Sequence, residues 1–205
     1  MSSVVIQGDS SGSVTLQAPA VAGSTVVTLP TTSMNMGTGG GSVATNTAFG
    51  TSALNSNTTG ANGVAIGYQA ANRNSTGTDN TIVGFNSAYW MTGSSNSAFG
   101  SGSLGTNNSN GGGSNNAAFG YQSLNNNQAS NNTAVGYQSL YSSNAAGNTA
   151  VGYKSAYANT SAGDVTAIGY SALTANTTGA GNTALGSASL SANTTGATNT
   201  ALGAY

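Results

Sequence analysis

The sequence from residue 132 to residue 152 reads NTAVGYQSLYSSNAAGNTAVG and contains two copies of one motif, 16 residues apart. The motif is Asn-Thr-Ala-Φ-Gly, where Φ is an apolar residue. Related copies recur between residues 46 and 203, and their glycines are 16 or 17 residues apart, with one spacing of 20. Such regular spacing is typical of a repeat architecture and not of a disordered low-complexity segment. The motif glycines are Gly50, Gly67, Gly84, Gly100, Gly120, Gly136, Gly152, Gly169, Gly186 and Gly203.

The length of the repeat predicts a β-solenoid. Helical repeats need about 33 residues or more, which is about twice the 16–17 residues of one repeat of this chain. The Gly, Asn, Thr and Ser clusters that follow each motif favour turns and disfavour helices. We therefore expect an all-β parallel solenoid of about ten coils, in which each coil of 16–17 residues has two short strands and two turns.

Two columns of apolar residues are the predicted interior of the coils. The first is the Φ column, the residue before each motif glycine, which is bulky and rich in strand-forming types. The second is the leucine column, four residues after each glycine. The Φ column is Phe49, Ile66, Val83, Phe99, Phe119, Val135, Val151, Ile168, Leu185 and Leu202. The leucine column is Leu54, Ala71, Ala88, Leu104, Leu124, Leu140, Ala156, Leu173 and Leu190.

The residue two before each glycine is almost always alanine, and this alanine column shares a strand face with the glycine, opposite Φ. Because alanine and glycine give this face almost no side-chain volume, another backbone can approach it closely. A core with about two large residues per coil is thin, and oligomerisation is the usual remedy. We therefore expect the Ala/Gly faces of several chains to meet on a common axis. The residues that represent this face are Ala48, Gly50, Ala65, Gly67, Ala134, Gly136, Ala150, Gly152, Ala184 and Gly186.

The composition disfavours enzymes and nucleic-acid binding. Only 2% of the residues are charged, the formal net charge is −1, and the chain has no Cys and no His. Its three acidic residues, Asp9, Asp79 and Asp164, lie far apart in the sequence, so no acid–base pair is expected. We predict no catalytic residue, no metal and no cofactor. We also predict no nucleic-acid partner, because basic clusters are absent, and no membrane insertion, because no apolar run reaches 18 residues.

Three surface features depart from the plain repeat. An aromatic column follows the motif glycine, and we interpret it as a structural ladder of stacked rings rather than a sugar-stacking stripe. Tyr89, Trp90 and Met91 form a cluster that is a candidate for surface contact; the competing interpretation is a thicker core or a plug at a trimer interface. The spacing of 20 contains GTNNSNGGGSNN (105–116), which predicts an outward loop that leaves the coil intact.

The repeats resemble known fibrous proteins. NTAVGYQSL and NTAVGYKSA are similar to the head repeats of trimeric autotransporter adhesins of the YadA-like kind, and GNTAVGYQSLYSSNAAGNTAVGY resembles repeats in fibre proteins of tailed bacteriophages, including cyanophages. The resemblance covers residues 46–205 and implies a left-handed parallel β-roll in a homotrimer. The motif departs from this pattern at 62–67 and 164–169, where we expect a weaker polar ladder but an intact coil.

Residues 1–36 differ from the repeats. VVIQG (4–8), SVTLQAPA (13–20) and STVVTLP (24–30) are strand-like runs separated by turn residues. Together they resemble the N-terminal segment of phage tail and structural fibre proteins, which implies docking onto other virion proteins. GTGGGS within residues 37–45 is typical of a flexible joint. We thus predict an anchor at 1–36, a joint at 37–45 and a β-roll shaft at 46–205.

The function that these patterns favour is that of a structural fibre on a phage virion, on the tail, neck or head, which contacts the host surface, including its glycans. The protein would be made in the bacterial cytoplasm and assembled into the particle. An adhesin passenger on a bacterial surface is the alternative. An ice-binding solenoid is a more remote one, suggested by a threonine column in the motif that Val64, Ser97 and Ala117 interrupt.

Overall fold

The computed structural model describes residues 15–17, 26–28, 43, 45–105 and 112–205. The chain divides into two compact units, Met1–Met34 and Asn35–Tyr205. Most of the joint predicted at 37–45 lies outside the described residues, so the predicted boundaries at 36 and 45 stay predictions.

The N-terminal unit contains two described strands, β1 (Thr15–Gln17) and β2 (Val26–Thr28). They pair antiparallel, with Thr15 opposite Thr28 and Gln17 opposite Val26. These strands lie within the strand-like runs 13–20 and 24–30. The third run, at 4–8, lies outside the described residues.

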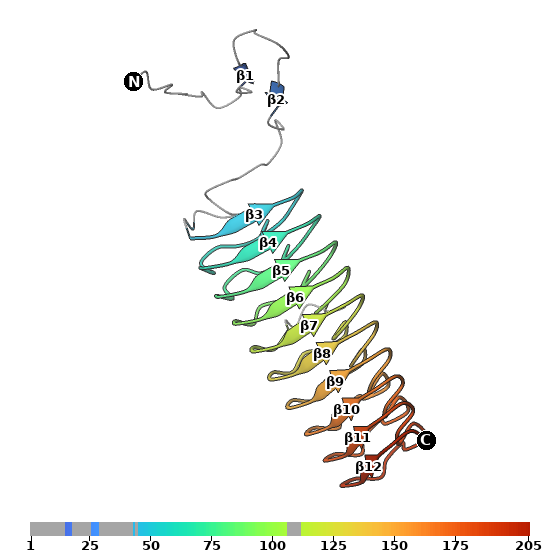
Figure 1. The fold of residues 1–205 in the computed structure, drawn as a ribbon. Coiled ribbons are helices and arrows are strands. Elements are labelled where there is room, and N and C mark those ends of the chain that lie inside the picture. Colours follow the sequence, from blue (N-terminus) through green and yellow to red (C-terminus); the bar gives the residue numbers. More distant parts are fainter. Residues whose placement is uncertain (1–14, 18–25, 29–42, 44, 106–111) are drawn as a thin grey trace. The chain divides into compact units, whose positions relative to one another are not determined.

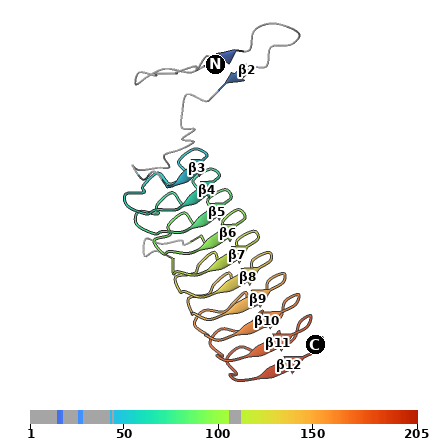
Figure 2. The same cartoon turned by 60° about the vertical axis from the view of Figure 1, so that its left-hand side comes forward.

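The second unit is a parallel β-solenoid with one three-residue strand in each coil (Figures 1 and 2). Each strand pairs with the next in register, so that motif residues of one kind lie over each other, as Ala134 lies over Ala150. This confirms the all-β parallel solenoid; the left-handed winding stays a prediction. The strands are β3 (Thr47–Phe49), β4 (Val64–Ile66), β5 (Thr81–Val83), β6 (Ser97–Phe99), β7 (Ala117–Phe119), β8 (Thr133–Val135), β9 (Thr149–Val151), β10 (Thr166–Ile168), β11 (Thr183–Leu185) and β12 (Thr200–Leu202).

The prediction of a second strand in each coil is wrong. On the return side, the residues two and four after the motif glycine have positive φ, as Gln122 and Leu124 do at 51° each. Positive φ lies outside the β region, so these residues cannot form a strand. The backbone still bonds from coil to coil there, since the Leu124 N–H donates to the Ser139 carbonyl at 3.0 Å. The return side is therefore a stack of turns.

The insertion at 105–116 leaves the stack intact, as predicted. β6 and β7 flank the spacing of 20 and still pair in register, with Ala98 opposite Ala118. Residues 106–111, in which the outward loop was predicted, lie outside the described residues.

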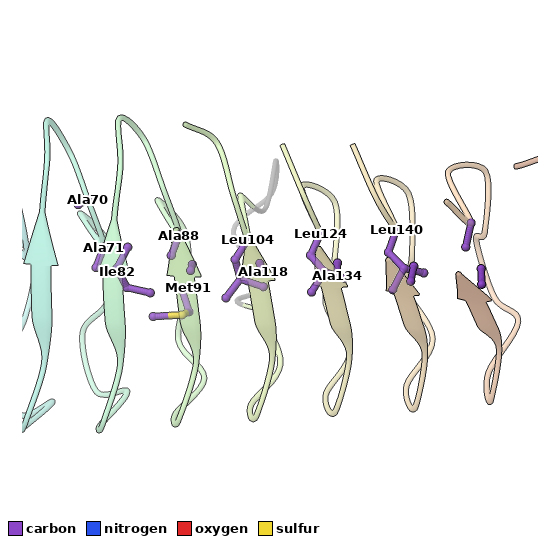
Figure 3. Packing of buried hydrophobic residues seen from close by; sticks show 14 of the residues in the cluster. Ala70, Ala71, Ile82, Ala88, Met91, Leu104, Ala118, Leu124, Ala134 and Leu140 are labelled. Carbon is purple, nitrogen blue, oxygen red and sulfur yellow. The ribbon is translucent and has the colours of Figure 1, made fainter. Parts of the chain in front are cut away.

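The core lies between the alanine column of the strands and the leucine column of the return side (Figure 3). Leu124, Leu140, Ala118 and Ala134 are all fully buried. The leucine column was correctly predicted to be interior. The Φ column was not: Val135, for example, is 38% exposed. Alternation along a strand sends Ala and Φ to opposite faces, and the narrow coil holds the small alanine opposite the leucine and leaves the bulky Φ outside.

The repeat that contains β5 departs from the usual core residues. Ile82 replaces the usual strand alanine in β5, and in the same repeat the leucine column carries Ala88, as it carries Ala71 and Ala156 in two other repeats. Ile82 and Ala88 are fully buried, and Met91 of that repeat is buried beside them (Figure 3). The side chains that fill the core thus differ from coil to coil, and Ile82 and Met91 are the largest of them in this repeat.

The motif asparagines form a buried ladder along the corner of the coils. The backbone N–H of Asn132 donates to Asn116 Oδ1, and that of Asn148 donates to Asn132 Oδ1, both at 2.9 Å. Gly63 and Val165 occupy this corner in the two repeats that depart from the motif, and neither has a side-chain oxygen to offer the next coil. The ladder is interrupted there while the strands continue to pair, as predicted.

Replacing Asn132 with alanine is expected to lower the free energy of unfolding by about 1–3 kcal/mol, because the buried N–H of Asn148 loses its acceptor. Asn144 is exposed in the same repeat, so Asn144→Ala is the matched control, with an expected change within about 0.5 kcal/mol. Chemical denaturation followed by circular dichroism measures both. Equal effects of the two substitutions would show that the ladder adds no stability.

Candidate functional site

The alanines predicted to lie on a trimer axis are enclosed by their own chain, whereas the glycines of the same prediction are only partly buried. Ala65, Ala134, Ala150 and Ala184 are fully buried, and Ala48 is nearly so. Since one chain already covers these alanines, the prediction that they meet the alanines of other chains is wrong, while association of several chains stays a prediction. The reason is the same as for the Φ column, because the bare face is the inside of the coil.

The close backbone approach predicted for this face does occur, but between coils of one chain. Gly136 has φ 133°, a conformation that L-residues rarely adopt, and a Cβ built on it would overlap the carbonyl oxygen of Gly152. The same relation holds at Gly50 against Gly67 and at Gly152 against Gly169. The motif glycines are thus required for coil stacking.

The surface that remains available to other molecules carries the Φ column. Its members project from the strands on the side opposite the core, in line with one another, because the strands pair in register. A continuous apolar stripe of this kind is unusual on a soluble monomer and typical of an interaction surface. The members that are at least 37% exposed are Phe49, Ile66, Phe99, Phe119, Val135, Leu185 and Leu202.

The aromatic column, one residue after each motif glycine, forms a ladder of stacked rings on the surface. The ring centroids of Tyr121 and Tyr137 are 5.3 Å apart, and the planes differ by 15°. Parallel stacking at this spacing follows from the coil repeat, as a structural ladder requires. The stacked rings are Tyr68 on Phe85, Tyr121 on Tyr137, Tyr137 on Tyr153 and Tyr153 on Tyr170.

The ladder has a break that the sequence analysis missed. The repeat of β6 carries Ser101 where its neighbours carry Phe85 and Tyr121, and two glycines, Gly102 and Gly105, follow it. The sequence does show this break, because an alignment of neighbouring repeats has small residues at all three of these positions in the repeat of β6 and large residues in the repeats on either side. We call the resulting gap, at Ser101, Gly102 and Gly105, the notch.

The cluster of Tyr89, Trp90 and Met91 is split between core and surface. Met91 is fully buried, so its predicted role in surface contact is wrong: the coil needs its volume inside. Tyr89 and Trp90 are half-buried and meet edge to face, with centroids 5.3 Å apart. The Arg73 guanidinium lies 4.2 Å from the centre of the Trp90 ring, a cation–π contact that holds the indole in place.

Residues 15–17, 26–28, 43, 45–105 and 112–205 contain no group of three or more His, Cys, Asp or Glu side chains that could hold a metal ion. Within the same residues there is also no helix long and apolar enough to span a bilayer. The chemistry that the surface does offer is that of aromatic rings, aliphatic side chains and neutral amides.

Comparison with protein-family models, with curated proteins and with solved structures gave no match.

Proposed function

We propose that this protein is a structural fibre of a phage virion, on the tail, neck or head, and that it projects from the particle toward the host surface. The observation that carries the proposal is the uninterrupted, in-register stacking of the coils from β3 to β12. At about 4.8 Å per coil the stack is roughly 5 nm long, which suits a stiff spacer. The resemblance of its repeats to those of phage fibres supports the same role.

The proposed fibre is a homotrimer that assembles through the Φ column. The alanine column is enclosed, so the apolar surface that association can bury is the exposed stripe of the Φ column. Its burial between chains would add the hydrophobic free energy that the thin core of one chain lacks. Rings such as Phe99 and Phe119, stacked with centroids 5.0 Å apart, give that stripe a flat and regular shape. Regular flat surfaces of this kind suit a symmetric interface.

Residues 1–36 anchor the proposed fibre to other virion proteins. Electron microscopy of intact particles, with antibody against residues 46–205, tests the function. The expected result is label on projections of the particle, and loss of that label when residues 1–36 are deleted.

A bacterial surface adhesin is the competing function, because adhesins of the YadA-like kind carry similar repeats. Label on the envelope of uninfected bacteria, with none on particles, would establish the adhesin and overturn the phage assignment.

A further inference from the structure

The notch is a groove of about 450 Å³ in an otherwise regular surface. The residues one, two and five after the motif glycine are Tyr121, Gln122 and Asn125 in the repeat of β7, whereas the repeat of β6 has Ser101, Gly102 and Gly105 at those positions. The side chains of the flanking repeats form its walls. The lining residues are Gln69, Phe85, Asn86, Tyr89, Trp90, Ser101, Gly102, Gly105, Tyr121, Gln122, Asn125 and Tyr141.

The spacing of the rings at the notch fits one further ring. Phe85 is stacked on Tyr68 on one side of the gap, and Tyr121 is stacked on Tyr137 on the other. Two coil steps separate Phe85 from Tyr121, so their rings are about 10 Å apart, twice the usual step of the ladder. A six-membered ring between them would lie at about 5 Å from each, the spacing of a stacked pair.

The polar groups of the groove are neutral. Its lining holds the amides of Gln69, Asn86, Gln122 and Asn125 and no charged side chain. Asn125 Nδ2 donates to the Gly102 carbonyl at 2.8 Å, which fixes the floor of the groove. Asn86 Oδ1 is buried and has no hydrogen-bond partner among the described residues. Because this oxygen has almost no accessible surface, a ligand in the groove meets the accessible parts of the four amides instead, which offer donors and acceptors to hydroxyl groups.

We propose that the notch binds a pyranose ring of a neutral oligosaccharide, inserted into the ladder between Phe85 and Tyr121. The C–H faces of the sugar lie on the two aromatic rings, and its equatorial hydroxyls meet the amides that line the groove. Aromatic walls with a few neutral polar groups suit such a ligand. A nucleobase would also fit between two rings, but no basic side chain lines the groove to bind its phosphate, and Arg73, the one basic residue that contacts the lining, is stacked on Trp90.

The proposal deepens the proposed function, on which it rests, by giving the fibre a ligand class on the host surface. The ladder elsewhere is a structural stack of rings, and only its interruption makes a site. This agrees with the interpretation of the aromatic column as a whole and places binding at one coil.

The test uses the full chain on an array of neutral oligosaccharides built from glucose, galactose, mannose and N-acetylglucosamine, with single-stranded oligonucleotides alongside. The best-binding oligosaccharide is then titrated in solution. Trp90 is the only tryptophan and lines the groove, so its fluorescence reports occupancy directly.

Ser101→Tyr restores the ring that the ladder lacks and fills the notch with a side chain that its neighbours already carry. Ser187→Tyr is the matched control, since it adds a ring at the same position of an exposed coil beside Tyr170. We expect Ser101→Tyr to weaken binding at least tenfold with no loss of thermal stability, and Ser187→Tyr to leave binding unchanged.

Three outcomes would overturn the proposal: no oligosaccharide binds the full chain, Ser101→Tyr binds as well as the unmodified chain, or the oligonucleotides bind in preference. None of them bears on where the protein lies on a particle, which the labelling experiment decides separately.

Discussion

Replacing Gly136 with alanine is expected to lower the free energy of unfolding by on the order of 4 kcal/mol and to disrupt the stack between β8 and β9. Two effects add. The φ of 133° is strained for any residue with a Cβ, and that Cβ would overlap the Gly152 carbonyl oxygen, a backbone atom that cannot rotate away. Because each coil contacts only its neighbours, the damage falls on one interface and splits the shaft. Chemical denaturation and hydrogen exchange measure the size and the place of the effect.

Gly203 supplies the control for this substitution. It has φ 126°, close to that of Gly136, but a Cβ built on it meets no atom within 4 Å. Gly203→Ala therefore isolates the backbone strain, with an expected cost of about 1–2 kcal/mol. Gly181→Ala is a second control at positive φ, away from the last coil, where the added Cβ makes only an ordinary contact with Thr198. If Gly136→Ala costs no more than Gly203→Ala, the coils do not stack as closely as described.

The second large effect is expected from an aspartate placed on either side of β8. Ala134 is fully buried, so Ala134→Asp puts a carboxylate into the core, which should prevent folding of that coil and its neighbours. Val135 is 38% exposed on the opposite face, so Val135→Asp should leave the coil folded and disrupt association of the chains instead. Circular dichroism reports the fold, and sedimentation equilibrium reports the mass.

The unmodified protein is expected to sediment at three times the 19.7 kDa of one chain, and Val135→Asp at a lower mass. Val135→Thr, which keeps the shape of the side chain without the charge, is the matched control and should stay associated. A folded Ala134→Asp together with an unfolded Val135→Asp would contradict the placement of the core. An unmodified chain that sediments as a monomer would contradict the proposed trimer.

Much of the fold follows from the sequence because the repeat is strict. The recurrence of the motif glycine fixes one coil per repeat, and the helix-breaking residues between motifs exclude helical repeats. The burial of Leu124 and Leu140 follows from the recurrence of an aliphatic residue at one position of the return side. The asparagine ladder and its interruption at Gly63 and Val165 were also predictable from alignment of the repeats alone.

The inside and the outside of the strands could not be predicted in the same way. A period of two places Ala134 and Val135 on opposite faces but does not say which face is interior. The usual preference for burying the larger side chain predicts that Val135 is interior. That prediction was wrong, because the narrow coil holds an alanine opposite the leucine. Ile82, the one large residue in the alanine column, shows that the interior face accepts a bulky side chain at one coil.

The candidate ligand site was less accessible to sequence reasoning. Tyr89 and Trp90 were identified as exceptional residues, but the groove beside them is formed by absent side chains at Ser101, Gly102 and Gly105. Missing side chains indicate a groove only when the repeats on either side are known to lie in register with the repeat that lacks them. The positive φ values of the return side, such as 49° at Leu104, were not predictable, because leucine rarely adopts that conformation.

The most direct test of the account is a set of distances along the shaft, measured by double electron–electron resonance between spin labels on engineered cysteines. The chain has no native cysteine, and Thr58, Gln128 and Thr194 are exposed residues that each lie eight positions after a motif glycine. Labelled chains are diluted with unlabelled chains so that only distances within one chain contribute. Four coils separate Thr194 from Gln128 and eight separate it from Thr58, so at about 4.8 Å per coil we predict narrow distributions near about 19 Å and about 38 Å. Broad distributions, or distances that do not double, would contradict a solenoid in which each repeat lies directly over the one before it.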